Sequence, residues 1–136
     1  MHSENTTFTM EQIYTAFGRV KSGADFPQFV QDLKTIGVTY YDTYVADGRT
    51  SYYGSGTFKL DSAAKYPALP ITAIASSEQL RHAITIHQQG QTDYPTFCLQ
   101  AAQAGVVKWR THMQEMTVTY FDQQDNPLLV EPIPQP

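Results

Sequence analysis

The sequence contains few of the residues that would commit it to one specific chemistry. Among its 136 residues there is a single cysteine, Cys98, so neither an internal disulfide nor a multi-cysteine metal site can form. Lys and Arg number nine against 13 Asp and Glu, which gives a formal net charge of -4. The basic footprint that nucleic acid or an anionic membrane requires is therefore missing. We predict neither a nucleic-acid partner nor a membrane partner.

Long apolar runs are missing too. No segment approaches the roughly 18 uninterrupted apolar residues of a membrane-spanning helix, and residues 1–9 are polar and lack the apolar centre of a signal peptide. A hydrophobic content of 41% and a charged content of 16% are typical of a globular chain. We therefore expect a single soluble domain, 1–136, located in the cytoplasm.

What the sequence does contain is one pattern written twice. Each copy has an acid, an aromatic residue followed by proline, a phenylalanine and a closing glycine–valine pair. They are Asp25, Phe26, Pro27, Phe29, Gly37 and Val38 in the first copy, and Asp93, Tyr94, Pro95, Phe97, Gly105 and Val106 in the second. An acid suits the start of a helix, proline is tolerated in the first turn, and glycine supplies a left-handed C-terminal cap. Each copy therefore predicts a helix of about three turns.

The similarity extends in both directions along the chain. Residues 9–17 and 76–84 both predict a preceding helix with capping-box spacing. Residues 38–45 and 106–113 are rich in β-branched and aromatic residues and predict strands. Returning strands are predicted at 50–54 and 118–122, with further strands at 57–60 and 128–130 and a short strand at 71–75.

This order of elements predicts the fold. We expect an α+β two-layer sandwich built from an internal duplication of a helix–helix–β-hairpin unit. The helices should cover one face of an antiparallel or mixed sheet. The pseudo-repeats span about 9–60 and 76–130, and a linker at 61–75 joins them.

Alternation along the predicted strands assigns side chains to the two faces of the sheet. The set expected under the helices is Thr39, Tyr41, Thr43 and Val45 with Val107, Trp109, Thr111 and Met113. The opposite set is Val38, Tyr40, Asp42 and Tyr44 with Val106, Lys108, Arg110 and His112. Because the second set is polar and aromatic, it should meet solvent or a ligand.

Most residues with reactive side chains have a structural explanation. Cys98 takes the position that Val30 has in the first copy, so a small buried residue is favoured over a catalytic nucleophile. His87 takes the position of Val20 and should lie at the edge of the core, and His82 takes that of Thr15. Neither histidine has a second ligand four residues away, as a helical metal site would need. We predict no metal and no cofactor.

The best candidate for a functional site is the polar-aromatic set of the sheet. The ligand-binding candidates are Tyr40, Asp42, Tyr44, Lys108, Arg110 and His112, with some of Thr50, Tyr52, Val118 and Tyr120. Aromatic rings supply contact area at low entropic cost, and Arg with His supplies anchoring charge. The simpler interpretation is a solvated face with an Asp42–Arg110 cross-strand pair worth about 0.2–1 kcal/mol.

Two long stretches carry a resemblance to a known family. They are "KSGADFPQFVQDLKTIGVTYYDTYVADGRTSYYG" and "TDYPTFCLQAAQAGVVKWRTHMQEMTVTYFDQQDNPLLVEPIP", and they are similar to an uncharacterised bacterial YbcV-like family that is often labelled "phage envelope protein". The resemblance covers nearly the whole chain. It implies a compact α+β domain of unknown function, and it supplies no catalytic residues.

Three functions compete on this basis. The first is a binding or interaction module that uses the polar-aromatic sheet face, with a second copy of the chain or a small polar ligand as its partner. The second is a small enzyme acting on a polar metabolite, with His112 as acid or base. The third is a phage or prophage accessory protein, which follows only from the label. The binding module is favoured over the enzyme.

Overall fold

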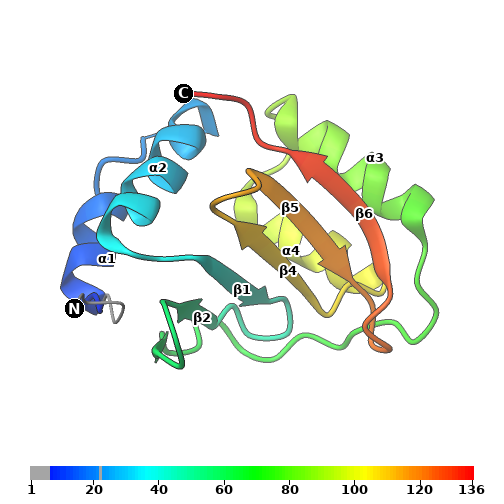
Figure 1. Cartoon of the computed structure of the whole chain (residues 1–136). Coiled ribbons are helices and arrows are strands. Elements are labelled where there is room, and N and C mark those ends of the chain that lie inside the picture. The colour runs from blue at the N-terminus through cyan, green and yellow to red at the C-terminus, as the bar shows by residue number, and fades with distance from the viewer. Residues whose placement is uncertain (1–6, 22) are drawn as a thin grey trace.

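The computed structural model describes residues 7–21 and 23–136, and it contains two helices followed by three strands, twice over (Figure 1). The first series comprises α1 (Met10–Phe17), the short 3₁₀ helix η1 (Gly23–Asp25), α2 (Phe26–Ile36), β1 (Tyr40–Tyr44), β2 (Thr50–Tyr53) and β3 (Lys59–Asp61). The second comprises α3 (Ser77–Gln88), α4 (Tyr94–Gln103), β4 (Lys108–His112), β5 (Thr117–Phe121) and β6 (Pro127–Pro132). Most of the polar N-terminal segment (residues 1–6) lies outside the described residues, as does Ser22.

All six strands form one antiparallel sheet in the order β3-β2-β1-β4-β5-β6. The α+β class and the antiparallel pairing are confirmed. The further strands expected near 57–60 and 128–130 are β3 and β6, so each series carries three strands. The strand predicted at 71–75 is wrong: the N–H of Thr72 donates to the carbonyl of Ala102 at the end of α4 instead of to a neighbouring strand.

The glycines that end α2 and α4 act as predicted. Gly37 and Gly105 adopt left-handed φ angles of 111° and 86°. The N–H groups of the next residues then bond back into the helix, from Val38 to the Leu33 carbonyl and from Val106 to the Ala101 carbonyl, each at 3.0 Å. This is the Schellman arrangement, in which the residue after the glycine packs against the last helical turn.

The helix starts agree with the prediction in only one of the two copies. The Asp93 carboxylate accepts a hydrogen bond from the Thr96 N–H at 2.9 Å and so caps α4. Asp25 does not cap α2; its carboxylate accepts from the Lys21 N–H at 2.8 Å. The difference arises because η1 precedes α2 and gives Asp25 a helical backbone conformation rather than the extended one that a capping residue needs.

The core lies between the helices and one face of the sheet. Buried side chains from all four α-helices join those of the strands in a single cluster. Phe97 on α4 lies against Trp109 on β4 with ring centroids 5.6 Å apart, and Figure 1 shows α4 behind β4 and β5. The helix-facing positions within the strands, among them Tyr41 and Thr111, are buried as predicted.

Three residues before the strands break the predicted alternation. Val38 and Val106 were assigned to the polar face but are buried in the core, and Thr39 was assigned to the helix side but is exposed. The reason is local. Strands β1 and β4 begin at Tyr40 and Lys108, so the residues before them still follow the geometry of the helix end, which directs both valines into the core.

Candidate functional site

The six candidate residues lie on the central strands of the sheet and pair directly across them. Tyr40 is opposite His112, Asp42 is opposite Arg110, and Tyr44 is opposite Lys108. Directly opposed residues of antiparallel strands share a face, and this is the face turned away from the core. The polar face, as we call it, includes Tyr40, Asp42, Tyr44, Arg49, Ser51, Tyr53, Lys59, Asp61, Lys108, Arg110, His112, Thr117, Thr119 and Phe121.

At the centre of the polar face a buried carboxylate is held by two cations. Arg110 donates from Nε to Oδ1 of Asp42 at 2.7 Å and from Nη2 to Oδ2 at 3.0 Å. The Nζ of Lys108 lies 3.6 Å from the same carboxylate, which is only 1% exposed. The hydrogen bonds to Asp42 raise the pKa of Arg110 above its ordinary value. Two cations for one carboxylate leave this centre with an excess of positive charge.

Aromatic rings line one side of this centre. Tyr40 and Tyr53 stack with ring centroids 4.4 Å apart, and the ring of His112 lies parallel to Tyr40 at 6.1 Å. The guanidinium of Arg110 sits 4.5 Å above the Tyr40 ring, and Lys59 lies 5.7 Å from the ring of Tyr53. These cation–π contacts hold the rings and the charges in fixed relative positions.

The other side of the centre has the same composition. Arg49 lies 4.0 Å from the ring of Tyr44, and Lys108 lies 5.4 Å from the ring of Phe121. The polar face thus carries four of the chain's nine Lys and Arg residues, each positioned against an aromatic ring. Such a surface offers flat apolar contact and positive charge together.

Four residues proposed as additional members of this face lie on the other one. Thr50, Tyr52, Val118 and Tyr120 are buried in the core. Tyr53 and Phe121 take their places on the polar face. The sequence contained a signal for this exchange. The loop between Tyr44 and Arg49 has four residues, Val45 to Gly48. When a hairpin loop has an even number of residues, each even-numbered residue of one strand lies opposite an odd-numbered residue of the other, and the two share a face.

His112 does not pair with any carboxylate of residues 7–21 or 23–136. Its Nδ1 accepts a long hydrogen bond, 3.4 Å, from the backbone N–H of Glu115, and its cross-strand neighbour is Tyr40. The Asp42 carboxylate that would orient it is engaged by Arg110 and Lys108 instead. An acid–base pair of His112 with Asp42 is therefore not assembled.

The remaining reactive side chains behave as structural residues. Cys98 is 1% exposed, and burial raises the pKa of its thiol, so it is not an activated nucleophile. His87 stacks on Phe97 at the edge of the core, with Nδ1 3.0 Å from the carbonyl of Thr92. Within the described ranges no three His, Cys, Asp or Glu side chains group as a metal site would require.

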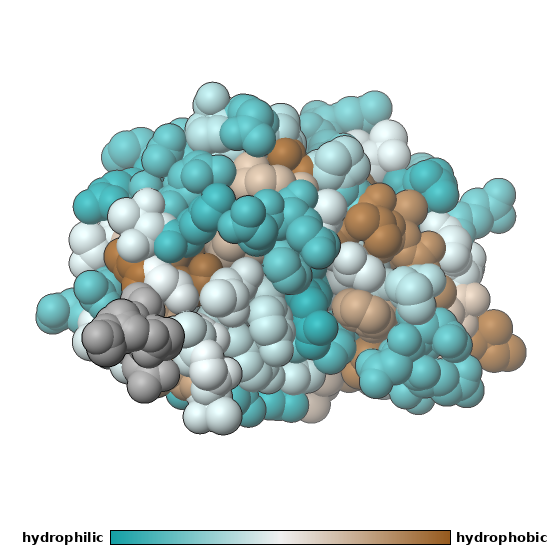
Figure 2. Space-filling model, in the orientation of Figure 1, coloured by the Kyte–Doolittle hydropathy of each residue, from teal (hydrophilic) through white to brown (hydrophobic). Residues whose placement is uncertain are grey.

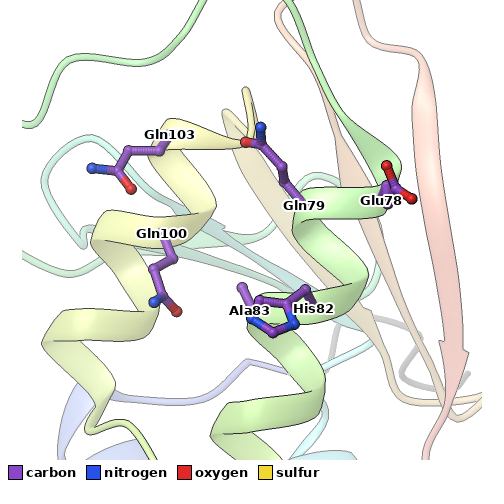
Figure 3. Close-up of a pocket in the computed structure, with 6 residues that line it drawn as sticks. All are labelled: Glu78, Gln79, His82, Ala83, Gln100 and Gln103. Atoms are coloured by element: carbon purple, nitrogen blue, oxygen red, sulfur yellow. The ribbon is translucent and has the colours of Figure 1, made fainter.

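Two hollows of the surface lie between paired helices and not on the polar face. The α3–α4 groove has a volume of about 450 Å³ and is lined by Glu78, Gln79, His82, Ala83, Gln100 and Gln103 (Figure 3). The α1–α2 groove, about 210 Å³, is lined by Glu11, Gln12, Thr15, Ala16, Arg19, Asp32 and Ile36. Figure 2 shows the surface in the orientation of Figure 1: hydrophilic residues dominate, and hydrophobic ones form separate patches.

Comparison with known proteins places the chain in a family. Residues 14–132 match the family described as "Protein of unknown function (DUF1398)". The chain belongs to the DUF1398 family. Uncharacterized proteins of Mycobacterium bovis and of two Mycobacterium tuberculosis strains are each 28% identical to it over 107 residues. The match covers 74% of the chain but 62% of the relatives' own length, so this DUF1398 member spans less than two thirds of those relatives.

In the part of the chain that the structure describes, no helix has both the length and the apolar character to cross a bilayer.

Proposed function

We propose that this DUF1398 protein is a small binding module whose contact surface is the polar face of its sheet. The observation that supports this most directly is the fixed array of aromatic rings and cations around the Asp42–Arg110 pair. The partner is another protein, a second copy of the chain included, or a small polar ligand. The absence of an assembled acid–base pair at His112 is why binding is favoured over catalysis.

The composition of the polar face suits recognition of a protein surface. Tyrosine and arginine are the residue types that contribute most to binding energy at interfaces. Rings that are already held by neighbouring cations lose little further conformational entropy when a partner binds. The rings and cations lie side by side along neighbouring strands of the sheet, and such an extended surface suits contact with a protein segment.

The charge of the polar face defines the partner further. Four cations are accompanied by Asp42, Asp47 and Asp61, each within 4 Å of one or two of them. These four cations and three carboxylates together sum to 4 − 3 = +1, on a chain whose formal net charge is -4. An acidic segment that also carries aromatic side chains complements the polar face best.

The residue that follows β6 turns away from the polar face. After β6 the N–H of Ile133 donates to the carbonyl of Met116 at 2.8 Å, and the Ile133 side chain is buried in the core. The chain's own tail therefore packs towards the helix side of the sheet at this point.

We further infer that the chain is one domain with pseudo-repeats at about 9–60 and 76–130 joined by the linker 61–75. The β1–β4 register supports this. Asp42 lies opposite Arg110 across the two strands. The two residues are also 110 − 42 = 68 positions apart, which is the spacing of the inferred repeats, so they occupy equivalent positions in the two repeats. Such a pair exists only where a pseudo-two-fold axis crosses the sheet. The inferred axis passes through the centre of the polar face.

The narrower family assignment belongs with these proposals. A YbcV-like relationship and a phage or prophage accessory role follow from the sequence resemblance and its label. Detection of the chain in purified virions would support that role.

The proposed function is tested with a probe of the stated chemistry. A random copolymer of glutamate and tyrosine should shift backbone amide resonances of β1 and β4 when titrated into the ¹⁵N-labelled chain. Lys108→Glu should weaken this binding at least about tenfold, because it reverses one charge of the central cluster. Arg81→Glu, an exposed position on α3, is the matched control and should leave the binding unchanged.

Self-association is measured on the same variants by light scattering. A dimer that Lys108→Glu dissociates and Arg81→Glu does not would identify a second copy as the partner. Resonance shifts confined to the helices, or a chain that stays monomeric to about 1 mM and does not respond to the copolymer, would contradict the proposal.

A further inference from the structure

Five of the six described residues that line the α3–α4 groove carry a hydrogen-bonding side chain. Figure 3 shows Gln79 and His82 reaching from α3, and Gln100 from α4, towards the space between the two helices, whereas the carboxylate of Glu78 points away from α4. In the described part of the chain, no side-chain hydrogen bond engages these groups. A buried amide oxygen without a partner, such as Oε1 of Gln100, is unfavourable unless something binds to it.

The α1–α2 groove shows what the same positions do when the chain uses them itself. Gln12 completes a capping box, since its Oε1 accepts from the backbone N–H of Thr9 at 2.8 Å. Gln79 has the same place after Ser76 in α3 but makes no such bond. The N–H of Ser76 is already bound to the carbonyl of Ala104 at 2.9 Å. The Gln79 amide is therefore released towards the groove.

Helices α2 and α4, which face α1 and α3, differ in the same way: the polar side chain is bonded within the chain in α2 and not in α4. In α2, Asp32 accepts from Gln28 at 3.0 Å and lies 3.5 Å from Nη1 of Arg19, so an ion pair bridges the α1–α2 groove. At the corresponding positions of the second pair stand Gln100 and Ile86, which cannot form that bridge. The unbridged groove is about twice as large.

We propose that the α3–α4 groove binds a small uncharged polyol of about the size of a monosaccharide. Among the described residues that line the groove there is no Lys or Arg, so a phosphate or a carboxylate finds no basic side chain there. None of them is Phe, Tyr or Trp either, so an aromatic ligand finds no such ring to stack on. The groups that do face the space are two glutamine amides and an imidazole, and each can both donate and accept.

Neighbouring hydroxyl groups match this set of partners. A hydroxyl donates one hydrogen and accepts others, so adjacent hydroxyls on a ring can bridge the amide of Gln79 to that of Gln100 across the groove. A small rotation of the Gln100 side chain would bring its Oε1 to a ligand hydroxyl. The volume of about 450 Å³ lies in the range of small-molecule sites. This site is independent of the polar face.

The test uses glucose as the probe and the ¹⁵N-labelled full chain. Glucose should shift the backbone and side-chain amide resonances of Gln79, Gln100 and Gln103, and Gln100→Ala should raise its dissociation constant at least about tenfold. Asp32→Ala in the α1–α2 groove is the matched control and should leave the dissociation constant of glucose unchanged. Gln100→Ala should keep the wild-type melting temperature because its Oε1 makes no hydrogen bond that the change would remove. If the melting temperature of Gln100→Ala falls, the same titration is repeated with Gln79→Ala.

Parallel titrations with inorganic phosphate and with putrescine separate the ligand classes. The proposal requires glucose to give the larger response at this groove. It is overturned if glucose gives no shifts at about 100 mM, if it shifts both grooves equally, or if phosphate or putrescine binds the α3–α4 groove more tightly than glucose.

Discussion

The two helix pairs of this protein have the same framework and use their polar side chains differently. In α1 and α2 the glutamine after the capping residue and the acid of the facing helix are bonded within the chain. In α3 and α4 the glutamines at those positions make no side-chain hydrogen bond to another described residue. A repeated backbone therefore does not imply a repeated site: where the side chains satisfy one another the groove is structural, and where they do not it is available to a ligand.

The largest effect on the free energy of unfolding is expected at Gly105, where the linker residue Ala75 packs against the end of α4. Gly105 and Gly90 both have left-handed φ angles, but a Cβ on Gly105 would lie 2.6 Å from the Cα of Ala75, whereas nothing lies within 4 Å of one on Gly90. Gly105→Ala should lower the free energy of unfolding by about 4 kcal/mol, adding overpacking to backbone strain. Gly90→Ala should lower it by about 1–2 kcal/mol. Equal losses in urea unfolding would contradict the close approach of the linker to α4.

The next effect compares the free energy of unfolding lost when a buried ion pair is broken with that lost when an exposed ion pair is broken. Arg110→Met leaves the buried Asp42 carboxylate with Lys108 alone and should cost about 3 kcal/mol, the lower end for a buried pair because Arg110 is itself partly exposed. Arg19→Met breaks the exposed pair with Asp32 and should cost less than about 0.5 kcal/mol.

A double-mutant cycle sharpens this result. Asp42→Leu with Arg110→Met should lose less stability than the sum of the two single changes, because it removes both members of the pair and leaves no buried carboxylate without its arginine. Additive losses in chemical unfolding would mean that the two residues do not act as a pair.

An intermediate loss of stability is expected at alkaline pH, and it arises from buried tyrosines on the helix side of the sheet. Burial raises the pKa of Tyr52 to about 12 and also raises the pKa of Tyr41. Since the folded values lie above the ordinary value near 10, the stability these phenols contribute is complete below pH 10 and is lost as the pH rises through the folded values.

For Tyr52 this contribution is about 2 kcal/mol. Tyr52→Phe should therefore give a flatter decline of the unfolding free energy between pH 10 and 12 than the wild type. Wild-type tyrosinate absorbance that develops fully near pH 10 without unfolding would show that these side chains are not buried.

The smallest stability effect tests the groove comparison by transferring the bridge. Ile86→Arg combined with Gln100→Asp reproduces the Arg19–Asp32 pair in the α3–α4 groove and should change stability by less than about 0.5 kcal/mol. Its effect on glucose binding should be large, because the bridge occupies the space and the amide of Gln100 is gone. Glucose binding that survives this exchange would place the site elsewhere.

Much of the fold could be predicted because local signals decide it. The left-handed glycines, the first-turn prolines and the strand composition predicted the helices and the strands of each hairpin without knowledge of tertiary contacts. The burial of Cys98 followed from its alignment with Val30. Asp25 escaped prediction because a 3₁₀ turn, which the sequence does not signal, precedes its helix.

The candidate sites were harder to predict, for two different reasons. Tyr53 and Phe121 were accessible in principle, since the parity of the hairpin loop assigns them to the polar face. The α3–α4 groove was not: it depends on the bond from Ser76 to Ala104, which joins the linker to the end of α4 and exists only in the folded chain. Sequence comparison of the two helix pairs gives the residues, but not which of them are left without partners.

One labelled sample titrated with both probes tests the account most directly. We predict that the glutamate–tyrosine copolymer shifts resonances of β1 and β4 and leaves α3 and α4 unchanged, and that glucose does the reverse. Shifts from both probes in the same region, or no shifts around Arg110 with the copolymer, would contradict the assignment of the polar face as the surface through which this protein binds.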